Sequence, residues 1–284
     1  MSRNNNRTGA PPHQEAPPQP EKQFDPLHFV APTEFVDLPS KGIGYPEGHS
    51  LHKKDTIEIR YMTAKDEDIL SSRTLLKKGV AVERFLDNVI VDKNIKASEL
   101  FVGDRNALII ASRISGYGAN YETRVNCPAC NTGGRFTFDL TDQVIHESSE
   151  SESLNLISNE NGTFSTVMPF TKFNIIFKLL VGKDEAEIVH LATQRAKTKS
   201  ADSSLTDQYK RMIASIEGHS DQEVINKYVN NMPTIDSRHL RACYRSAAPD
   251  VKIVQDFNCP SCGHEEGMEV PFGADFFWPD RNLR

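Results

Sequence analysis

The sequence predicts an α+β fold with a core of mixed helices and short strands. Short runs with strand-like alternation and runs with helical periodicity both occur before residue 145. Mostly helical patterns follow from Asp184 to about Ala248. In addition, Asn-Cys-Pro-x-Cys occurs twice, at residues 126–130 and 258–262, and strand-like runs flank each copy.

The composition bounds the kind of protein. The chain has 284 residues, of which 38% are hydrophobic and 25% charged, enough for a packed core under a very polar surface. The formal net charge of −6 argues against a dedicated nucleic-acid binder, because such domains are usually clearly basic. No apolar run reaches the roughly 18 residues of a membrane span, and the N-terminus lacks the apolar core of a secretory signal. We therefore expect a cytoplasmic protein, where paired cysteines are metal ligands more often than disulfides.

Four segments are expected along the chain. Residues 1–24 are rich in Asn, Gln, Pro and Ala, and they are predicted to be a disordered tail because they carry almost no large apolar side chains. Residues 25–145 are expected to form a core with the first cysteine pair. Residues 146–247 are expected to be a hairpin and helical insertion. Residues 248–284 should carry the second cysteine pair and C-terminal strands that pack with the 25–145 core.

The first elements are predicted to be two strands and a helix. The stretch "EFVDLPSKGIGYP" is typical of a short strand followed by a Pro- and Gly-marked turn, and its glycines do not form a GxGxxG phosphate loop. "TIEIRYM" alternates apolar and polar residues as a strand does. Thr63 is expected to be the N-cap of the next helix. Asp66, Glu67 and Asp68 then occupy its first turn, where the helix dipole favours acids.

Two further helices are predicted before the first cysteine pair. "AVERFLDNVIV" has the periodicity of an amphipathic helix. "RNALIIASRIS" is apolar over most of its surface and should be central to the core, with Asp104 as its N-cap and Gly116 at its end. Arg105 and Arg113 are expected at the polar edge of this helix, in internal salt bridges.

The long segment between the cysteine pairs is predicted to begin with an exposed loop, "HESSESESLNLISNENG". "TFSTVMPF" and "KFNIIFKLL" follow, and their patterns predict a β-hairpin. Four helices are then expected, separated by "KTKSADSS", Gly218 and Pro233. Their expected bounds are 184–197, 205–217, 221–231 and 236–246.

The two cysteine pairs predict one metal site with four thiolate ligands. The ligands are Cys127, Cys130, Cys259 and Cys262. A closed structural zinc site takes four such ligands in a tetrahedron. Asn131 and Gly263 follow the pairs at equivalent positions, and both residue types tolerate the left-handed backbone that a tight knuckle needs. The flanking strands therefore predict a zinc ribbon. Its structural zinc ion would clamp together the ends of the chain between the pairs.

Other uses of the cysteines are less well supported. An iron–sulfur centre would use the same four residues, and a redox-active disulfide lacks the thioredoxin-like βαβ context. His264 is an alternative ligand, although we expect it to be an exposed turn residue. Four thiolates leave no position for a water, and "HEEGM" is not HExxH, so a catalytic metal is not expected. Cys243 lies in a predicted helix and is expected to be a core residue.

No other group of residues predicts chemistry. "LLVGKDE" lacks the glycine loop that precedes the lysine of a Walker motif, and no nucleophile elbow occurs. The aromatic residues Phe276, Phe277 and Trp278 are expected to cap the core of the ribbon. The alternative is that they anchor a partner, because aromatic residues are enriched at the centres of interfaces.

Five stretches of the chain are distinctive as sequence. They are "FVDLPSKGIGYPEGHSL", "IEIRYMTAKDEDILSS", "LLKKGVAVERFLDNVIVDKNI", "LFVGDRNALIIASRISGYGANYE" and "VNCPAC". Together they cover roughly residues 33–140, and they resemble the baseplate hub subunit, or hub assembly protein, family of T-even-type contractile-tailed bacteriophages. The later hairpin, helices and "CPSC" are compatible with that family but less distinctive.

The resemblance implies a non-enzymatic role in building the central hub of the phage baseplate, as a component or an assembly factor. The implied partners are other baseplate hub and tail proteins. The chain itself is expected to have no catalytic residues and to bind no small-molecule substrate, membrane or nucleic acid. The implied location is the host cell cytoplasm during assembly, with retention in the virion tail baseplate as the alternative. We also hypothesise that "DLPSKGIGYP" and the helix start at 63–70 form a partner surface, since both combine a rigid turn with charge.

The main alternative is a nucleic-acid-associated zinc-ribbon protein that acts in regulation or as a replication accessory. Such a protein would need a basic, aromatic-studded face near the knuckles. Arg124, Arg135 and Lys252 are the cations there, and they are outnumbered by carboxylates. An enzyme is a more distant alternative, because the sequence offers no convergent catalytic groups.

Overall fold

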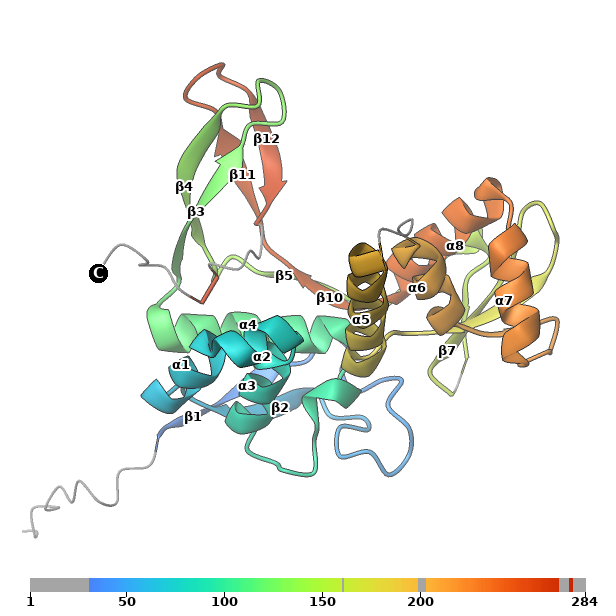
Figure 1. Cartoon of the computed structure of the whole chain (residues 1–284), viewed down its shortest axis with the longest axis horizontal. Coiled ribbons are helices and arrows are strands. Elements are labelled where there is room, and N and C mark those ends of the chain that lie inside the picture. The colour runs from blue at the N-terminus through green and yellow to red at the C-terminus, as the bar shows by residue number, and fades with distance from the viewer. Residues whose placement is uncertain (1–30, 160, 199–202, 271–275, 278–284) are drawn as a thin grey trace, which may run out of the picture. The chain divides into compact units, whose positions relative to one another are not determined.

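The structure is a computed structural model, and it describes residues 31–159, 161–198, 203–270 and 276–277. The chain divides after Val30 into two units, and the second unit begins at Ala31. The tail predicted at residues 1–24 lies outside the described residues. The described residues form helices and small antiparallel sheets (Figure 1), so the prediction of an α+β fold is confirmed.

The N-terminal part begins with a two-stranded antiparallel sheet of β1 (Thr33–Asp37) and β2 (Thr56–Arg60). The alternation that predicted β2 is matched by burial, since Ile57 and Ile59 point into the core. The loop between the strands folds back on its own ends. Its Gly42 has a φ of 68°, and a Cβ there would lie 2.3 Å from the backbone of Leu51. Only glycine fits this crossing.

Four α-helices and one short 3₁₀ segment follow. They are α1 (Ala64–Ser71), α2 (Arg73–Lys78), α3 (Ala81–Val89), η2 (Ala97–Glu99) and α4 (Val102–Tyr117). Thr63 is the N-cap of α1, as predicted. Helix α3 buries Phe85, Leu86 and Val89, which share one face of an amphipathic helix.

Helix α4 is central to the core, as predicted, but it differs in two details. It begins at Val102, so Asp104 lies inside its first turn and is not the N-cap. Arg113 is fully buried, contrary to the prediction of a polar edge. Its guanidinium donates to the backbone oxygens of Gly118, Asn120 and Phe276 at 2.7–3.2 Å. Helical periodicity placed this side chain on an edge, whereas the chain beyond the helix covers it with carbonyl groups.

Two antiparallel hairpins carry the cysteine pairs. The first joins β3 (Asn120–Asn126) to β4 (Gly133–Asp139), and the second joins β11 (Val254–Asn258) to β12 (Glu265–Glu269). Figure 1 shows the hairpins side by side although they come from distant parts of the chain. The strand patterns around both Asn-Cys-Pro-x-Cys stretches are therefore confirmed.

A second, short sheet joins the same two parts of the chain. β5 (Val144–His146) pairs antiparallel with β10 (Asp250–Lys252). β10 packs on α4, and a Cβ at Gly103 would lie 2.0 Å from the oxygen of Pro249. The chain thus leaves and returns beside α4 at residues 146 and 250.

The elements between β5 and β10 form a four-stranded antiparallel sheet with helices. The order in the sheet is β6–β7–β8–β9. The strands and the 3₁₀ segment are η3 (Glu152–Leu154), β6 (Ile157–Ser158), β7 (Thr163–Val167), β8 (Asn174–Lys178) and β9 (Ile213–Ile216). The helices are α5 (Gly182–Thr198), α6 (Ser204–Met212), α7 (Gln222–Asn231) and α8 (Thr234–Ala247).

The predicted hairpin in this segment is confirmed as β7–β8, and one predicted helix is wrong at its end. The helix expected over 205–217 stops at Met212, and residues 213–216 form β9 on the edge of the sheet. Ile213 and Ile216 are buried beside β8. A strand pairing with a distant partner is invisible to local periodicity, so the apolar run was assigned to the preceding helix.

The aromatic residues near the C-terminus pack into the core. The ring of Phe276 lies 5.1 Å from that of Tyr121 in β3, and the ring of Phe277 lies 5.3 Å from that of Phe85 in α3. Their burial serves the helical core and the base of the first hairpin. Trp278 lies outside the described residues. None of the helices in the described part of the chain combines the length and apolarity of a membrane span.

Candidate metal centre

The four predicted ligands meet where the tips of the two hairpins face each other. The Sγ atoms of Cys127, Cys130, Cys259 and Cys262 all lie within 4.8 Å of one another. Between the hairpins, the Sγ atoms of Cys127 and Cys262 lie 3.7 Å apart, as do those of Cys130 and Cys259. A tetrahedron with metal–sulfur bonds of about 2.3 Å has edges of about 3.8 Å, so the four sulfurs match a single tetrahedral ion.

The two knuckles have the same backbone geometry. The N–H of Cys127 donates to the oxygen of Thr132, and the N–H of Asn131 donates to the oxygen of Cys127. In the second knuckle Cys259 N–H donates to His264, and Gly263 N–H donates to Cys259. These bonds join positions with the same spacing in each knuckle. The repeated Asn-Cys-Pro-x-Cys sequence therefore folds twice into one local structure.

A left-handed residue closes each knuckle. Asn131 has a φ of 59° and Gly263 a φ of 71°. These are the two positions at which the sequence predicted a tolerance for positive φ, and both predictions are confirmed. Asn carries a side chain and Gly does not, but each residue type adopts the left-handed backbone conformation at a low cost.

Contacts below the cysteines hold the hairpins together. The rings of Phe136 in β4 and Phe257 in β11 lie 4.6 Å apart. The side chain of Gln255 bonds to the backbone of Asp139 in both directions, with the Asp139 N–H donating at 3.1 Å and the Gln255 amide donating to the Asp139 oxygen. These contacts join β4 to β11 below the cysteines.

The two exposed cysteines of the cluster have shifted pKa values. Hydrogen bonds with Thr132 lower the pKa of Cys130 to about 6. A bond with the backbone of His264 lowers the pKa of Cys262, but its sulfur neighbours, Cys130 first, raise it overall to about 12. Thiolates at this distance repel one another, and the second charge is disfavoured once the first has formed. A bound cation removes this repulsion and allows four thiolates.

The other sulfur and imidazole groups that the sequence raised do not join the cluster. His264 Nε2 lies 3.1 Å from Glu266 Oε2, on the strand that follows the knuckle. Cys243 is fully buried on α8, where its sulfur lies 3.6 Å from Thr166 Oγ1, and burial raises its pKa. The 3.7 Å distances between sulfur atoms of the two hairpins are also far longer than a disulfide bond of about 2.05 Å.

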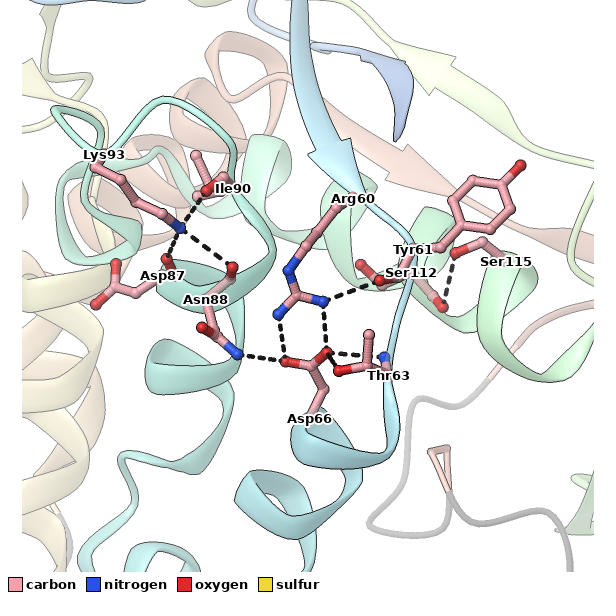
Figure 2. A network of polar contacts seen from close by, with 10 residues as sticks. All are labelled: Arg60, Tyr61, Thr63, Asp66, Asp87, Asn88, Ile90, Lys93, Ser112 and Ser115. Atoms are coloured by element: carbon pink, nitrogen blue, oxygen red, sulfur yellow. Dashed lines mark hydrogen bonds and ion pairs between the residues drawn. The ribbon is translucent and has the colours of Figure 1, made fainter. Parts of the chain in front are cut away.

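A second polar cluster surrounds Asp66 at the start of α1 (Figure 2). The carboxylate is fully buried, and Arg60 binds it with two hydrogen bonds of 2.7 and 2.9 Å. Thr63 donates to it from both its N–H and its hydroxyl, and Asn88 donates from α3 at 2.6 Å. Burial raises the pKa of Asp66, but these bonds outweigh burial and lower it to about 2. Asp66 thus ties β2, α1 and α3 together.

Asp104 plays a similar part in the first turn of α4. Its buried carboxylate accepts hydrogen bonds from the N–H and hydroxyl of Ser40 and from the hydroxyl of Tyr45, at 2.7–3.0 Å. The Tyr45 oxygen in turn accepts from Phe101 N–H. No cation faces Asp104 in this network, and burial raises its pKa despite the hydrogen bonds. The carboxylate fixes the β1–β2 loop to α4.

These two clusters give "DLPSKGIGYP" and residues 63–70 core roles that the sequence did not reveal, and the hypothesis that both segments form a partner surface stays a prediction. Leu38, Ser40 and Tyr45 are buried in the loop, and Asp66 and Leu70 are buried in the helix. Both segments therefore have core roles that their charge and turn residues concealed. The sequence carried one signal for Asp66, since Thr-x-x-Asp is the spacing of a capping box.

Comparison with known proteins gives one match over most of the chain. A family model described as "T4 bacteriophage base plate protein" matches residues 33–278. Neither curated proteins nor solved structures gave a match. The matched range includes both hairpins, the helical core and the segment between β5 and β10.

Proposed function

The chain belongs to the T4 bacteriophage base plate protein family, and we propose from this premise that it is a component or assembly factor of the central hub of a contractile-tail baseplate. It acts by contacts with other hub and tail proteins and performs no catalysis. The observation that carries this proposal is the family match over residues 33–278. The resemblance of residues 33–140 to hub subunits narrows the proposal from the baseplate to its hub.

The chemistry of the described residues supports a structural role. Two of the buried carboxylates, Asp66 and Asp104, join loops and helices through their hydrogen bonds. The cysteines form a closed set of four ligands, which leaves no position for a substrate on the metal. A protein of this kind supplies rigid surfaces for assembly.

We further propose that the cysteine cluster binds one structural zinc ion and that the paired hairpins are a zinc ribbon. Cys127 and Cys130 supply two ligands from one knuckle, and Cys259 and Cys262 supply two from the other. The 3.7 Å distances between sulfur atoms of the two hairpins match the edge of a zinc–thiolate tetrahedron, and this match supports zinc over a multi-iron centre. The ion would supply charge neutralisation and a cross-link, and no redox chemistry.

The proposed domain organisation follows from this cross-link. Residues 25–145 and 248–284 would form one body closed by the metal, and residues 146–247 would be an insertion that leaves it and returns. The β5–β10 pairing supports this organisation, because it brings residue 146 beside residue 250. The metal would then close a loop of more than a hundred residues, which is where a cross-link gains most in chain entropy.

The alternative of a nucleic-acid-associated zinc-ribbon protein has weaker support. The cations around the hairpins are Arg124, Arg135 and Lys252, and Arg135 is engaged with Glu122. The exposed carboxylates there are Asp139, Asp256, Glu265, Glu266 and Glu269. Such a surface repels a phosphate backbone. A salt-sensitive gel shift with DNA at low protein concentration would revive this alternative.

The experiment for the proposed function uses a phage that lacks this gene, grown with and without the protein supplied in trans. We expect baseplate hubs to be absent or incomplete without the protein and restored with it, as measured by sedimentation and electron microscopy of tail intermediates. Normal hubs without the protein would contradict the proposal. Metal analysis of the purified chain should give one zinc per chain, and iron in its place would contradict the zinc assignment alone.

A further inference from the structure

An apolar groove beside an unpaired strand edge is the feature of the surface that the proposed function does not use. The groove has a volume of about 340 Å³. One wall is β1, the floor is α4, and the other wall is the β5–β10 pair. Its apolar lining is Val36, Ala107, Ala111, Ile114, Ile145 and Val251.

The edge of β1 that does not face β2 is free to pair. Tyr61 N–H donates to the oxygen of Pro32, and Leu38 N–H donates to that of Asp55. In an antiparallel ladder the bonded residues alternate, so even-numbered residues of β1 bond to β2. The backbone groups of Thr33, Phe35 and Asp37 therefore point away from β2. β1 pairs with no other strand among the described residues.

Two side chains on β1 lack, among the described residues, the contacts that their positions would favour. Phe35 is 71% exposed, although it lies on a strand next to an apolar groove. Glu34 also lines the groove, and its Oε1 atom is buried with no hydrogen-bond partner. A buried carboxylate oxygen without a donor is costly, and an unpaired strand edge is a template for pairing with another chain.

We propose that this groove binds an extended segment of another baseplate protein, which adds a strand to the β1 edge. The segment alternates apolar residues, which face α4, with residues that include a Lys or Arg for Glu34. Main-chain hydrogen bonds to Phe35 and Asp37 give affinity, and the groove and Glu34 give specificity. The identity of the partner as a baseplate protein rests on the proposed function.

Charge favours a different protein over a second copy of this chain. β1 has the sequence Thr-Glu-Phe-Val-Asp, with two carboxylates and no cation. Glu34 and Asp37 point to opposite faces of the strand, and a second β1 strand paired at this edge would supply no cation for Glu34. A basic strand supplies that cation.

The test uses the full-length, zinc-containing protein and an array of overlapping peptides from the other baseplate proteins of the same phage. The peptides have about 12 residues, twice the usual strand length. The strongest binder is then labelled, and its affinity is measured by fluorescence anisotropy. We expect it to alternate apolar residues and to contain a Lys or Arg. No binder in the array would overturn the proposal.

Substitutions on β1 separate the backbone and charge contributions. Phe35→Pro removes an outward N–H and leaves the bonds to β2 intact, and it should weaken binding by about tenfold, since a lost hydrogen bond with an unsatisfied partner costs about that much. Glu34→Gln should weaken the same peptide but change little when the peptide's own Lys or Arg is replaced by Gln. Phe170→Ala is the matched control, because Phe170 is also 67% exposed and lies outside the groove. Equal binding by all variants would overturn the proposal.

A second measurement does not depend on the folding of a variant. In the wild-type protein, the N–H groups of Phe35 and Asp37 should exchange rapidly with solvent and become protected when the peptide binds. Protection elsewhere but not at these groups would overturn the proposal. So would a dimer in sedimentation that Phe35→Pro disrupts, or faster exchange at these groups after deletion of residues 1–30, since each identifies a different occupant.

The outcomes also separate this inference from the proposed function. Equal incorporation of wild type and Phe35→Pro into baseplate hubs would overturn the groove proposal and leave the function intact. Absence of the wild-type protein from hubs and their assembly would overturn the function itself.

Discussion

The cluster around Asp66 and the cluster of four cysteines both join parts of the chain that are distant in sequence, but they lie in different surroundings. Asp66 is fully buried, and it is bonded to residues of β2 and α3 as well as to Thr63 at the start of α1. Among the cysteines, Cys130 and Cys262 are exposed, and the Phe136 and Phe257 rings contact each other between the hairpins that carry them.

The difference shows which interaction each region depends on. Near Asp66, burial of apolar surface supplies the stability, and the polar network fixes the arrangement of the elements. At the hairpin tips two of the four cysteines are exposed, and the proposed metal would supply the cross-link there. Removing the polar network should weaken a region that still has a core, whereas removing the metal should leave the hairpins without a cross-link at their tips.

The largest effect is expected from loss of the metal ligands. Cys259→Ser should release the metal and separate the hairpins, with a loss on the order of several kcal/mol, since apparent binding free energies of structural zinc reach about 10–16 kcal/mol. Zinc content and hydrogen exchange of β3, β4, β11 and β12 measure this. Cys243→Ala is the control, because this buried cysteine lies outside the cluster and should leave one zinc bound. Full zinc content in Cys259→Ser would contradict the assignment.

The next largest effect is expected at the Arg60–Asp66 pair. Arg60→Met leaves the Asp66 carboxylate buried with hydrogen bonds from Thr63 and Asn88 but no cation, and such a change costs about 3–5 kcal/mol. Urea unfolding of the zinc-containing protein measures the loss. Asp68→Asn, which removes an exposed carboxylate from the same helix, should change stability far less. A comparable loss in both variants would mean that the helix dipole, and not the buried pair, sets the stability here.

These two regions also differ in how much of them the sequence predicts. The clustering of the four cysteines and the left-handed positions Asn131 and Gly263 are predicted correctly because the CPxC spacing and the tolerance for positive φ are local properties of the chain. The burial of Asp66 and Asp104 depends on Asn88, Ser40 and Tyr45, which reach them from other elements. An acid in a first helical turn has the same local pattern whether it faces solvent or the core.

Non-local pairing explains the remaining differences. β9 was assigned to a helix because Ile213 and Ile216 suit either structure, and only β8 decides between them. Arg113 was placed on a polar edge because a charged residue is rarely buried without an acid. Its partners are three backbone oxygens, and no sequence pattern marks a carbonyl as free to accept.

A smaller effect on stability, with a distinct pH dependence, is expected at the buried carboxylates of Asp66 and Asp104. Bonds from Arg60, Thr63 and Asn88 lower the pKa of Asp66 to about 2, so its contribution is full above the unfolded pKa of 3.8 and is lost as the pH falls toward 2. Burial raises the pKa of Asp104, so its ionised form costs stability above that raised pKa, and the cost disappears as the pH falls.

The two carboxylates should therefore give opposite slopes. From pH 7 downward, wild type should gain stability relative to Asp104→Asn as Asp104 protonates, and below pH 3.8 it should lose its advantage over Asp66→Asn. Urea midpoints of the three proteins at each pH measure these differences. Each comparison is made at one pH, so that release of metal by acid affects all three proteins. Parallel slopes for the two variants would contradict the assignment of opposite shifts.

The smallest effect is expected at the left-handed residue of each knuckle, and it tests whether the two halves of the metal site are equivalent. A Cβ at Gly263 meets no atom within 4 Å, so Gly263→Ala changes only the backbone preference at a φ of 71°. The expected cost is about 1 kcal/mol, the usual penalty for an L-residue in this region. Asn131→Gly should be neutral within about 0.5 kcal/mol, because it relieves strain while adding freedom to the unfolded chain. The midpoint of zinc loss to a competing chelator measures both variants. If Gly263→Ala were neutral and Asn131→Gly costly, the Asn131 side chain would be making a contact that the shared knuckle geometry does not require, and the halves would not be equivalent.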